Sequence, residues 1–339
     1  MVSRRTALMT AAAVATTPIG VAGCGGGRPS TGANQPDRPA KVGYVTGFGT
    51  FGREAYAWVA KDKGYFADAG IEVTIVPGAA GEANLNLLRA GRADFAVIDY
   101  SGAVVRAGTG KFHDMRCVAA LAEQTQVAIM GMADRGIRNP ADLAGRKIGQ
   151  APGAVPKTLF PAYARLAGFD PTRVQWLEAL TTAQLPAALA AGRVDAIGQF
   201  PMGLPAVQAA AGKRPVTVLP YSRYITDLYG NVLITSTRLL DRDPGLVSRF
   251  ATALLKGLTY AVQNPDESGR IMQRYVPTTK AEIAAQELTI LAQYVSANAG
   301  TRLGNFDKAK VARGIALIRS LGLIPDGFDP SEIVDPARL

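Results

Sequence analysis

Few side chains in this chain of 339 residues are suited to covalent or metal chemistry. One His and two Cys cannot form a zinc site of four Cys, or of two Cys and two His. The only His, His113, lies in the polar stretch Gly110-Lys-Phe-His-Asp, and we expect the neighbouring Asp114 to be solvated rather than part of a catalytic triad. Cys117 lies in an apolar run and is expected to be a buried small hydrophobe. We therefore expect no enzymatic activity, no metal and no cofactor.

Aromatic and polar side chains that follow apolar runs favour non-covalent ligand binding instead. Phe48, Phe51 and Tyr100 are candidates to stack on a flat ligand, with packing inside the fold as the alternative for each. Asp99 ends an apolar run, where an unpaired carboxylate is costly, so it either pairs with a protein donor or meets a ligand amine or amidine. Gly153 lies at an expected helix start, where backbone N–H groups suit an anion.

Further candidates are neutral hydrogen-bonding side chains and one more aromatic ring. Phe200 follows a later apolar run and is a candidate to clamp a ligand from the opposite side. The neutral hydrogen-bonding candidates are Thr46, Ser101, Gln124, Thr181 and Gln199.

The apolar runs that would position these residues are expected to be strands alternating with helices. Strands are expected at 41–45, 71–76 and 94–98, with helices at 53–69 and 82–90 between them. This β-α-β-α-β order predicts an α/β fold with a mostly parallel sheet flanked by helices. Further strands are expected at 127–132 and 230–236, a capped helical turn at 139–145, and helices at 244–262, 265–275, 280–294 and 307–321.

The pattern occurs twice along the chain. Ala90-Gly-Arg-Ala-Asp-Phe-Ala matches Ala191-Gly-Arg-Val-Asp-Ala-Ile, and Lys41-Val-Gly matches Lys147-Ile-Gly. In each unit a helix ends at Gly, and an Asp precedes a buried strand. The sequence therefore predicts two α/β lobes of similar topology. Ligands bind outside the carboxyl ends of strands in such sheets, so we expect the candidate residues to line a cleft between the lobes.

The N-terminal residues have the composition of an export signal. Residues 1–23 begin with Arg4 and Arg5 and continue as a stretch of apolar and small residues. The Arg pair resembles the twin-arginine motif, but Ala7 stands where that motif usually has Phe, so the Tat and Sec routes both stay open. Val21-Ala-Gly-Cys24 resembles a bacterial lipobox, which implies that Cys24 is lipidated; the alternative is an incidental Cys. Residues 24–40 are expected to be a flexible tether.

The chain is basic, with 37 Lys and Arg against 27 Asp and Glu and a net charge of +10 at pH 7. The basic residues are scattered, with no run of five or more. Together with export, this scatter argues against nucleic acid as a partner. Attraction to an anionic membrane surface is the better explanation, and an anionic ligand remains possible.

Four segments of the chain resemble motifs of one protein family. They are Gly64-Tyr-Phe-Ala-Asp-Ala-Gly-Ile-Glu-Val, Ala90-Gly-Arg-Ala-Asp-Phe-Ala-Val, Gly136-Ile-Arg-Asn-Pro-Ala-Asp-Leu-Ala-Gly-Arg-Lys-Ile-Gly, and Tyr229-Gly-Asn-Val-Leu-Ile-Thr through Asn264-Pro. The family that they resemble is the ABC-transporter solute-binding proteins of the nitrate/sulfonate/taurine and thiamine-pyrimidine-precursor (SsuA/THI5-like) group. The resemblance runs from about Lys41 to Tyr294 and is specific for the family but not for the ligand.

This resemblance implies a two-lobed type II periplasmic-binding fold whose lobes close on a ligand about a hinge. Lobe one would comprise 41–127 and 228–339, and lobe two 128–227, with Tyr229 at the hinge and able to reach the cleft. It also implies a monomeric receptor on the extracytoplasmic face of the membrane, with an ABC permease and its ATPase as partners.

The ligand stays open on sequence grounds. The His that the pyrimidine-precursor branch usually carries before its Gly-Tyr-Phe motif is absent from residues 52–60. Candidates are a pyrimidine-like heterocycle, a sulfonate, nitrate or another small oxyanion. The alternatives in function are an enzyme on the same fold and a ligand-sensing subunit of a membrane receptor.

Overall fold

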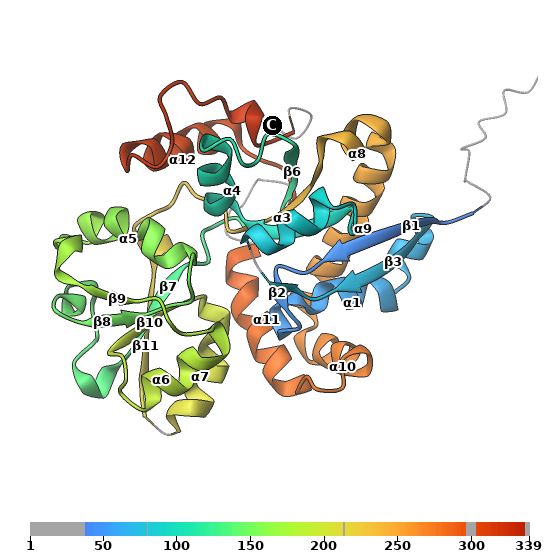
Figure 1. Ribbon diagram of the computed structural model, residues 1–339. Helices are drawn as coiled ribbons and strands as arrows, with labels where there is room; N and C mark the ends of the chain where they lie inside the picture. The colour runs from blue at the N-terminus through green and yellow to red at the C-terminus, as the bar shows by residue number, and fades with distance from the viewer. Residues whose placement is uncertain (1–37, 80, 213, 296–302, 336–339) are drawn as a thin grey trace, which may run out of the picture. The chain divides into compact units, whose positions relative to one another are not determined.

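The computed structural model describes residues 38–79, 81–212, 214–295 and 303–335, and Figure 1 shows its elements. The predicted signal, Cys24 and most of the predicted tether lie outside these residues. The described chain forms two five-stranded sheets, each flanked by helices, and a two-stranded ribbon.

The bounds of the elements are as follows. The strands are β1 (Ala40–Val45), β2 (Phe48–Gly49), β3 (Ile71–Val76), β4 (Gly78–Ala79), β5 (Phe95–Asp99), β6 (Met115–Ala120), β7 (Ala128–Met132), β8 (Lys147–Gly149), β9 (Gln175–Leu177), β10 (Ala196–Gln199), β11 (Val216–Pro220) and β12 (Asn231–Ser236). The α-helices are α1 (Ala55–Asp62), α2 (Tyr65–Asp68), α3 (Gly81–Arg89), α4 (Tyr100–Gly108), α5 (Val155–Leu166), α6 (Leu185–Ala190), α7 (Leu204–Ala211), α8 (Thr237–Arg242), α9 (Pro244–Gln263), α10 (Pro265–Tyr275), α11 (Ala281–Val295) and α12 (Lys308–Ser320). Short 3-10 helices include η1 (Gly52–Glu54), η3 (Pro140–Leu143) and η5 (Thr182–Gln184).

The two large sheets have the same strand order and the same strand directions. The first sheet has the order β3-β1-β5-β12-β6, and the second, read from its β9 edge, has the order β9-β8-β10-β7-β11. In the first sheet β1 is parallel to β3 and β5, while β12 is antiparallel to β5 and β6. In the second sheet β8 is parallel to β9 and β10, while β7 is antiparallel to β10 and β11. Each sheet is thus mostly parallel with one reversed strand, and the predicted two-lobed α/β fold is confirmed.

The reversed strand of each sheet follows a crossing of the chain from the other sheet. After β6 the chain leaves the first sheet and enters the second through β7. After β11 it returns and enters the first sheet through β12. Figure 1 shows the two sheets as separate groups of elements joined by these two crossings. Below, lobe one is the part that carries the first sheet, and lobe two the part that carries the second.

The internal repeat has a physical basis in glycine turns. Each predicted helix stop is a Gly with positive φ, at 69° for Gly70, 64° for Gly91, 83° for Gly168 and 73° for Gly192. Left-handed backbone of this kind is favourable for Gly because it has no Cβ. A helix therefore ends at the same point before each of the four strands that follow.

The aspartates of the repeat accept equivalent backbone hydrogen bonds in the two lobes. The Asp94 carboxylate accepts a hydrogen bond from the Gly43 backbone N–H at 2.9 Å, and Asp195 accepts one from the Lys147 N–H at 2.8 Å. Lys147 therefore corresponds to Gly43, and the sequence match of Lys147 with Lys41 was wrong by two residues. A shift of two residues keeps every side chain on its face of the sheet, so hydrophobic alternation alone did not reveal it.

Two further predictions are corrected at the start of lobe one. The helix expected at 53–69 is divided into η1, α1 and α2, because Gly64 adopts a φ of 77° between α1 and α2. The expected loop after β5 is instead helix α4, which begins at Tyr100 with the Asp99 side chain as its cap. The capping bond runs from the Gly102 N–H to Asp99 Oδ1 at 3.1 Å.

The core of lobe one is centred on an aromatic cluster beneath the first sheet. The Phe250 ring of α9 is fully buried and lies 4.0 Å from the Phe95 ring, 5.1 Å from the Phe66 ring and 5.7 Å from the Tyr44 ring, measured between centroids. Cys117 of β6 is fully buried in a second cluster, as the sequence predicted. No helix within the described ranges combines the length and the apolar character needed to cross a membrane.

Candidate functional site

A cavity of about 390 Å³ lies between the ends of strands from the two large sheets. From lobe one it is lined by Gly47 and Phe48 after β1, by Gly81–Ala83 at the start of α3, and by Asp99 at the end of β5. From lobe two it is lined by 151–156, before and within the first turn of α5, and by Gly198–Phe200 at the end of β10. Its volume is in the range of small-molecule sites, and its place is the one that the strand-end rule predicts.

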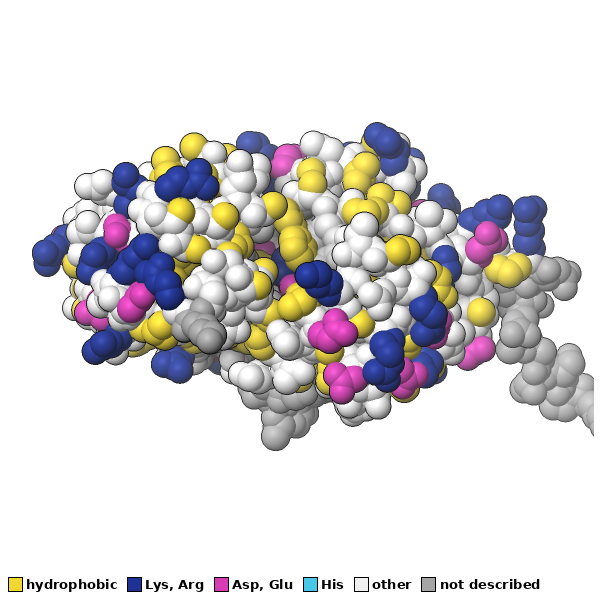
Figure 2. Space-filling model, turned by 90° about the horizontal axis from the view of Figure 1, so that it is seen from below, with side chains coloured by type: hydrophobic (Ala, Val, Ile, Leu, Met, Phe, Trp, Pro, Cys, Tyr) yellow, Lys and Arg dark blue, Asp and Glu magenta, His cyan; other side chains and the backbone are white. Residues whose placement is uncertain are grey.

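The face seen in Figure 2 carries hydrophobic side chains beside a central hollow. Lys and Arg side chains are spread over this face rather than gathered at one place, as the scatter of basic residues in the sequence suggested.

The structure brings five of the predicted site residues together in the lining of this cavity. Phe48 and Asp99 come from lobe one, and Gly153, Gln199 and Phe200 from lobe two. The amide oxygen of Gln199 accepts the Phe200 N–H at 2.9 Å, which fixes this side chain at the end of β10. Two aromatic rings and two polar groups of opposite lobes therefore border the same space.

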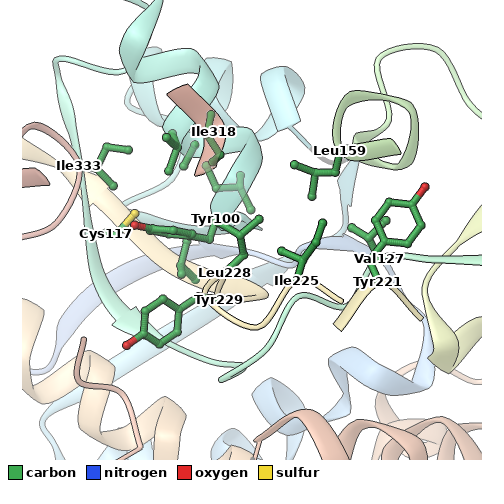
Figure 3. Close-up of a cluster of buried hydrophobic side chains, with 14 of the residues drawn as sticks. Tyr100, Cys117, Val127, Leu159, Tyr221, Ile225, Leu228, Tyr229, Ile318 and Ile333 are labelled. Carbon is green, nitrogen blue, oxygen red and sulfur yellow. The ribbon is translucent and has the colours of Figure 1, made fainter. Parts of the chain in front are cut away.

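Three predicted residues lie outside the cavity, namely Tyr100 and Ser101 in the first turn of α4, and Tyr229 just before β12. Tyr100 is 0% exposed and packs edge to face on Tyr229, with 5.6 Å between ring centroids. Figure 3 shows both rings inside the hydrophobic cluster, beside residues of the return crossing such as Leu228. The Tyr229 hydroxyl accepts the Asp307 N–H at 2.7 Å, and the Ser101 hydroxyl donates to Asp99 Oδ1. Tyr100 and Tyr229 are thus core residues, and Ser101 supports Asp99.

Four other predicted residues lie near the cavity but are not part of its lining. The Thr46 hydroxyl is fully buried and donates to the Gly49 carbonyl at 2.6 Å. Phe51 packs on Phe48 with 5.7 Å between centroids. Thr181 is exposed and caps η5, so the next residue, Thr182, reaches the cavity instead. Gln124 lies in the outbound crossing and is half-buried.

Sequence reasoning missed the charged residues of the lining and one amide. The missed residues are Arg53, Glu54, Glu82, Arg106 and Asn231. Arg53 and Glu54 directly follow the predicted aromatic pair, and Asn231 pairs with Asp99 across the sheet. The sequence therefore offered a way to find these three residues, because they lie near candidates that were already chosen. Glu82 and Arg106 lie in the helices α3 and α4 and adjoin none of the predicted candidates in sequence.

The two arginines of the lining already have carboxylate partners. Arg53 lies 3.6 Å from Glu287 of α11, and both side chains are nearly fully buried. The Arg106 Nε lies 3.2 Å from Glu82 Oε2, at a more exposed position. Their positive charge is therefore largely compensated before any ligand arrives.

The Glu54 carboxylate is 1% exposed and helps to hold the loop after β1. It accepts the Gly47 N–H at 3.0 Å and the Tyr56 hydroxyl at 3.1 Å. Burial raises the pKa of Glu54, and the neighbouring Arg53 guanidinium and these hydrogen bonds oppose that rise.

Asp99 presents an oxygen that the fold does not use. Its Oδ1 accepts from the Ser101 hydroxyl and from the Gly102 N–H, whereas no described residue makes a hydrogen bond to the buried Oδ2. Burial raises the pKa of Asp99, and hydrogen bonds from Ser101 and Gly102 oppose that rise. An unpartnered buried carboxylate oxygen at the edge of a cavity is suited to accept a hydrogen bond from a ligand.

The loop that presents Phe48 is held by a buried amide. The Asn84 side chain donates to the backbone oxygens of Thr46 and Val97, each at 2.9 Å, and accepts the Ala79 N–H at 2.9 Å. Asn84 thus joins β1, the β2–β4 ribbon and β5 at the point where they meet the cavity. An amide with every group satisfied in this way rigidifies the site.

Lobe two contributes a helix start whose first turn carries Lys157, and the Lys157 N–H donates to Gln150 Oε1 at 3.1 Å. Helix α5 has 12 residues, its cap residue Ala154 gives no side-chain hydrogen bond, and its first turn carries no acidic residue. Such a terminus has a partial positive charge that favours a ligand oxygen.

The lining offers little for covalent or metal chemistry. Among the described residues of the lining there is no Cys, Ser or His. Over the described ranges no group of three or more His, Cys, Asp and Glu is arranged to hold a metal. His113 is exposed, and its Nδ1 lies 2.9 Å from the Gly110 carbonyl oxygen, outside the cavity.

One curated relative is a binding protein. A formylaminopyrimidine-binding protein of Halalkalibacterium halodurans is 25% identical over 218 residues, which cover 64% of this chain and 65% of the relative. The match thus spans slightly less than two thirds of the relative's own length.

Solved structures share the fold over most of the chain. The periplasmic aliphatic sulphonate-binding protein SsuA of Escherichia coli has a TM-score of 0.67 at 18% identity, and covers 87% of this chain and 91% of its own. The ligand-binding component of an ABC-type import system from Staphylococcus aureus has a TM-score of 0.66 at 15% identity, with coverages of 89% and 97%. The fold is therefore that of ligand-binding components of ABC-type import systems. A family model described as NMT1/THI5 like matches residues 54–268, and the chain belongs to this family.

Proposed function

We propose that this chain is the extracytoplasmic substrate-binding lipoprotein of an ABC importer. Its ligand binds in the cavity between the lobes, and the closed form docks on a permease that an ATPase drives. The observation that supports this most is that one cavity is lined from the strand ends of both sheets. A ligand that contacts both lobes stabilises the closed arrangement, because it binds that state better than the open one.

The proposed hinge consists of the two crossings, with lobe one at 41–127 and 228–339 and lobe two at 128–227. Cys24 is the proposed lipid attachment site, which would hold the mature protein at the membrane surface. Both proposals rest on the sequence, and the order of strands in the two sheets agrees with the first.

For the ligand we propose a small heterocycle with N–H donors, of the pyrimidine type. Within the lining Glu82 pairs with Arg106, and Arg53 pairs with Glu287 outside it, whereas Glu54 and Asp99 accept hydrogen bonds from neutral donors. The free acceptor is Asp99 Oδ2, so a ligand donor completes the site, whereas an oxyanion would face an uncompensated carboxylate. Phe48 and Phe200 supply rings of the two lobes for a flat ligand.

A small sulfonate or similar oxyanion is the second candidate. The start of α5 favours it, because the first turn of that helix has no acidic side chain and its Lys157 N–H is held by the neutral Gln150 amide. The sulphonate-binding relatives share the fold, but their identity is too low to transfer a ligand.

Calorimetric titration of the purified mature domain decides between the two ligand classes. We expect formylaminopyrimidine to bind in the micromolar range or tighter and to raise the Tm in proportion to ligand concentration. Hexanesulfonate and nitrate should not bind. Tight binding of hexanesulfonate with none of the pyrimidine would overturn the ligand class but leave the receptor role standing. Absence of binding by either class would contradict the proposed site.

A further inference from the structure

We propose that Glu287 of α11 is a positioning residue that fixes the Phe48 ring for stacking on the ligand. This inference rests on the proposed function, since it concerns how the same cavity holds a flat ligand. Glu287 lies outside the lining, and it is 2% exposed. It is therefore a buried carboxylate for which ligand contact supplies no explanation.

Phe48 is carried by a small structure that has little rigidity of its own. It lies on β2, a strand of two residues that pairs only with the two-residue strand β4. A two-stranded ribbon of this size is marginal by itself. The ring is half-buried, so its orientation must be set by contacts from outside the ribbon.

These contacts form a chain of three residues behind the ring. The Phe51 ring stacks on Phe48 with 5.7 Å between centroids and an interplanar angle of 18°. The Arg53 guanidinium lies over the Phe51 ring, 4.4 Å from its centroid. Arg53 in turn lies 3.6 Å from a carboxylate oxygen of Glu287. Aromatic stacking and cation–π contact therefore connect the ligand-facing ring to α11.

Glu287 also fixes the backbone of the same loop. Its carboxylate accepts the Arg53 N–H at 3.0 Å and a hydrogen bond from the Gly52 backbone. The start of η1 and α1 has no side-chain cap from its own residues, so Glu287 caps it from a distant helix. A Cβ on Gly52 would lie 2.2 Å from Ala284 Cα, which means that the loop is pressed against α11.

Preorganisation of this kind raises affinity by reducing the entropy lost on binding. The loop from Phe48 to Arg53 thus behaves as one unit whose orientation α11 sets. We infer that loss of the Glu287 carboxylate loosens the Phe48 ring while leaving the ring itself in place.

The first test observes the ring without a ligand. The full mature domain carries 4-fluorophenylalanine at position 48, and ¹⁹F NMR reports its environment. We expect one narrow resonance in the parent, and a shifted or broadened one in Glu287→Gln and in Phe51→Leu. The matched control is Glu267→Gln, which breaks the ion pair of Lys63 and Glu267 (2.6 Å), remote from the cavity, and should leave the resonance unchanged. An unchanged resonance in Glu287→Gln would overturn the proposal.

The second test separates positioning from folding. Glu287→Gln leaves Arg53 without its buried partner and is expected to lower stability. The double variant Arg53→Met/Glu287→Gln removes both charges and should recover stability, because the Gln oxygen still accepts the Arg53 N–H and no buried charge is left without a partner. Binding of formylaminopyrimidine should stay about tenfold weaker in both variants, the effect of one aromatic pair.

The two tests also keep this proposal distinct from the proposed function. Parent-like affinity in the stable double variant would overturn the role of Glu287 while the receptor role stands. Failure of the parent to bind any flat heterocycle would remove the ligand class and this inference together.

Discussion

Replacing Asp99 by Asn changes the charge of the cavity without changing the size of the side chain. Asn retains an oxygen that can accept from the Gly102 N–H, at 3.1 Å in the parent, so the cap of α4 is preserved. The atom in the place of the unpartnered Oδ2 becomes an NH₂ group, which donates where the parent accepts. The substitution therefore separates the role of Asp99 in binding from its role in folding.

The expected loss of ligand affinity follows from the hydrogen bond that Asp99→Asn removes. A hydrogen bond to a charged group contributes about 1.5–3 kcal/mol. Since about 1.4 kcal/mol corresponds to a factor of ten in Kd, we expect Asp99→Asn to bind formylaminopyrimidine roughly 10- to 150-fold more weakly. Asn and Asp are equivalent as helix caps, and burial raises the pKa of Asp99, so loss of its charge should leave the Tm unchanged or raise it.

The pH dependence of ligand affinity supplies an independent test of the role of Asp99. The folded-state pKa of Asp99 is raised, so protonation on acidification begins above the ordinary Asp pKa of about 3.9. A protonated Asp99 no longer attracts a ligand donor as a charge, so the parent should lose affinity as pH falls through that raised pKa. Asp99→Asn should show a flatter profile, measured by calorimetric titration between about pH 4 and pH 8.

Asp170→Asn is the matched control. Asp170 caps a 3-10 helix by accepting the Thr172 N–H at 2.8 Å, and it is exposed and outside the cavity. It should change neither Kd nor the pH profile. If Asp99→Asn bound the pyrimidine within twofold of the parent, with its Tm intact, the assignment of Oδ2 as the ligand acceptor would be refuted.

Three other outcomes are expected. Phe250→Ala should lower the free energy of unfolding by about 3–5 kcal/mol in urea titrations, because it empties the centre of the lobe-one aromatic cluster; a loss below about 1 kcal/mol would contradict that packing. Gly78→Ala should weaken ligand binding and lower the Tm, since its Cβ would lie 2.0 Å from the Thr46 carbonyl oxygen and displace the ribbon that carries Phe48. Cys117 should resist a thiol reagent until the protein is denatured, because burial both shields its thiol and raises its pKa; rapid labelling of the native protein would show that β6 opens.

The sequence predicted the bounds of those elements that are marked by residues within or next to them. Strand β3 (Ile71–Val76) and helix α10 (Pro265–Tyr275) have the predicted bounds, because period-two alternation and flanking Pro or Gly mark them within a few residues. The cavity position was also predictable, since the strand-end rule depends on strand order alone. The antiparallel placement of β7 and β12 was not, because alternation does not carry direction.

The site was harder to predict where a residue depends on a distant partner. Tyr100 was placed in the cleft because the start of α4 was missed, although Asp99 followed by Ser101 and Gly102 is a typical cap. Arg53 and Glu54 were not among the candidates, and the partner of Arg53, Glu287, is 234 residues away in the sequence. Only the folded chain shows that these charges are buried.

The arrangement of β12 has a consequence for the order in which the lobes can form. This strand joins β5 to β6, and its Thr235 hydroxyl donates to the Asp94 carbonyl across 141 residues of sequence. All strands of the second sheet are synthesised by Pro220, whereas β5 has a free edge beside its pairing with β1, and β6 has no partner strand, until residues 231–236 follow. Lobe two is therefore able to complete its sheet first, and a chain that stops before β12 would carry one finished sheet and one to which β6 is not joined.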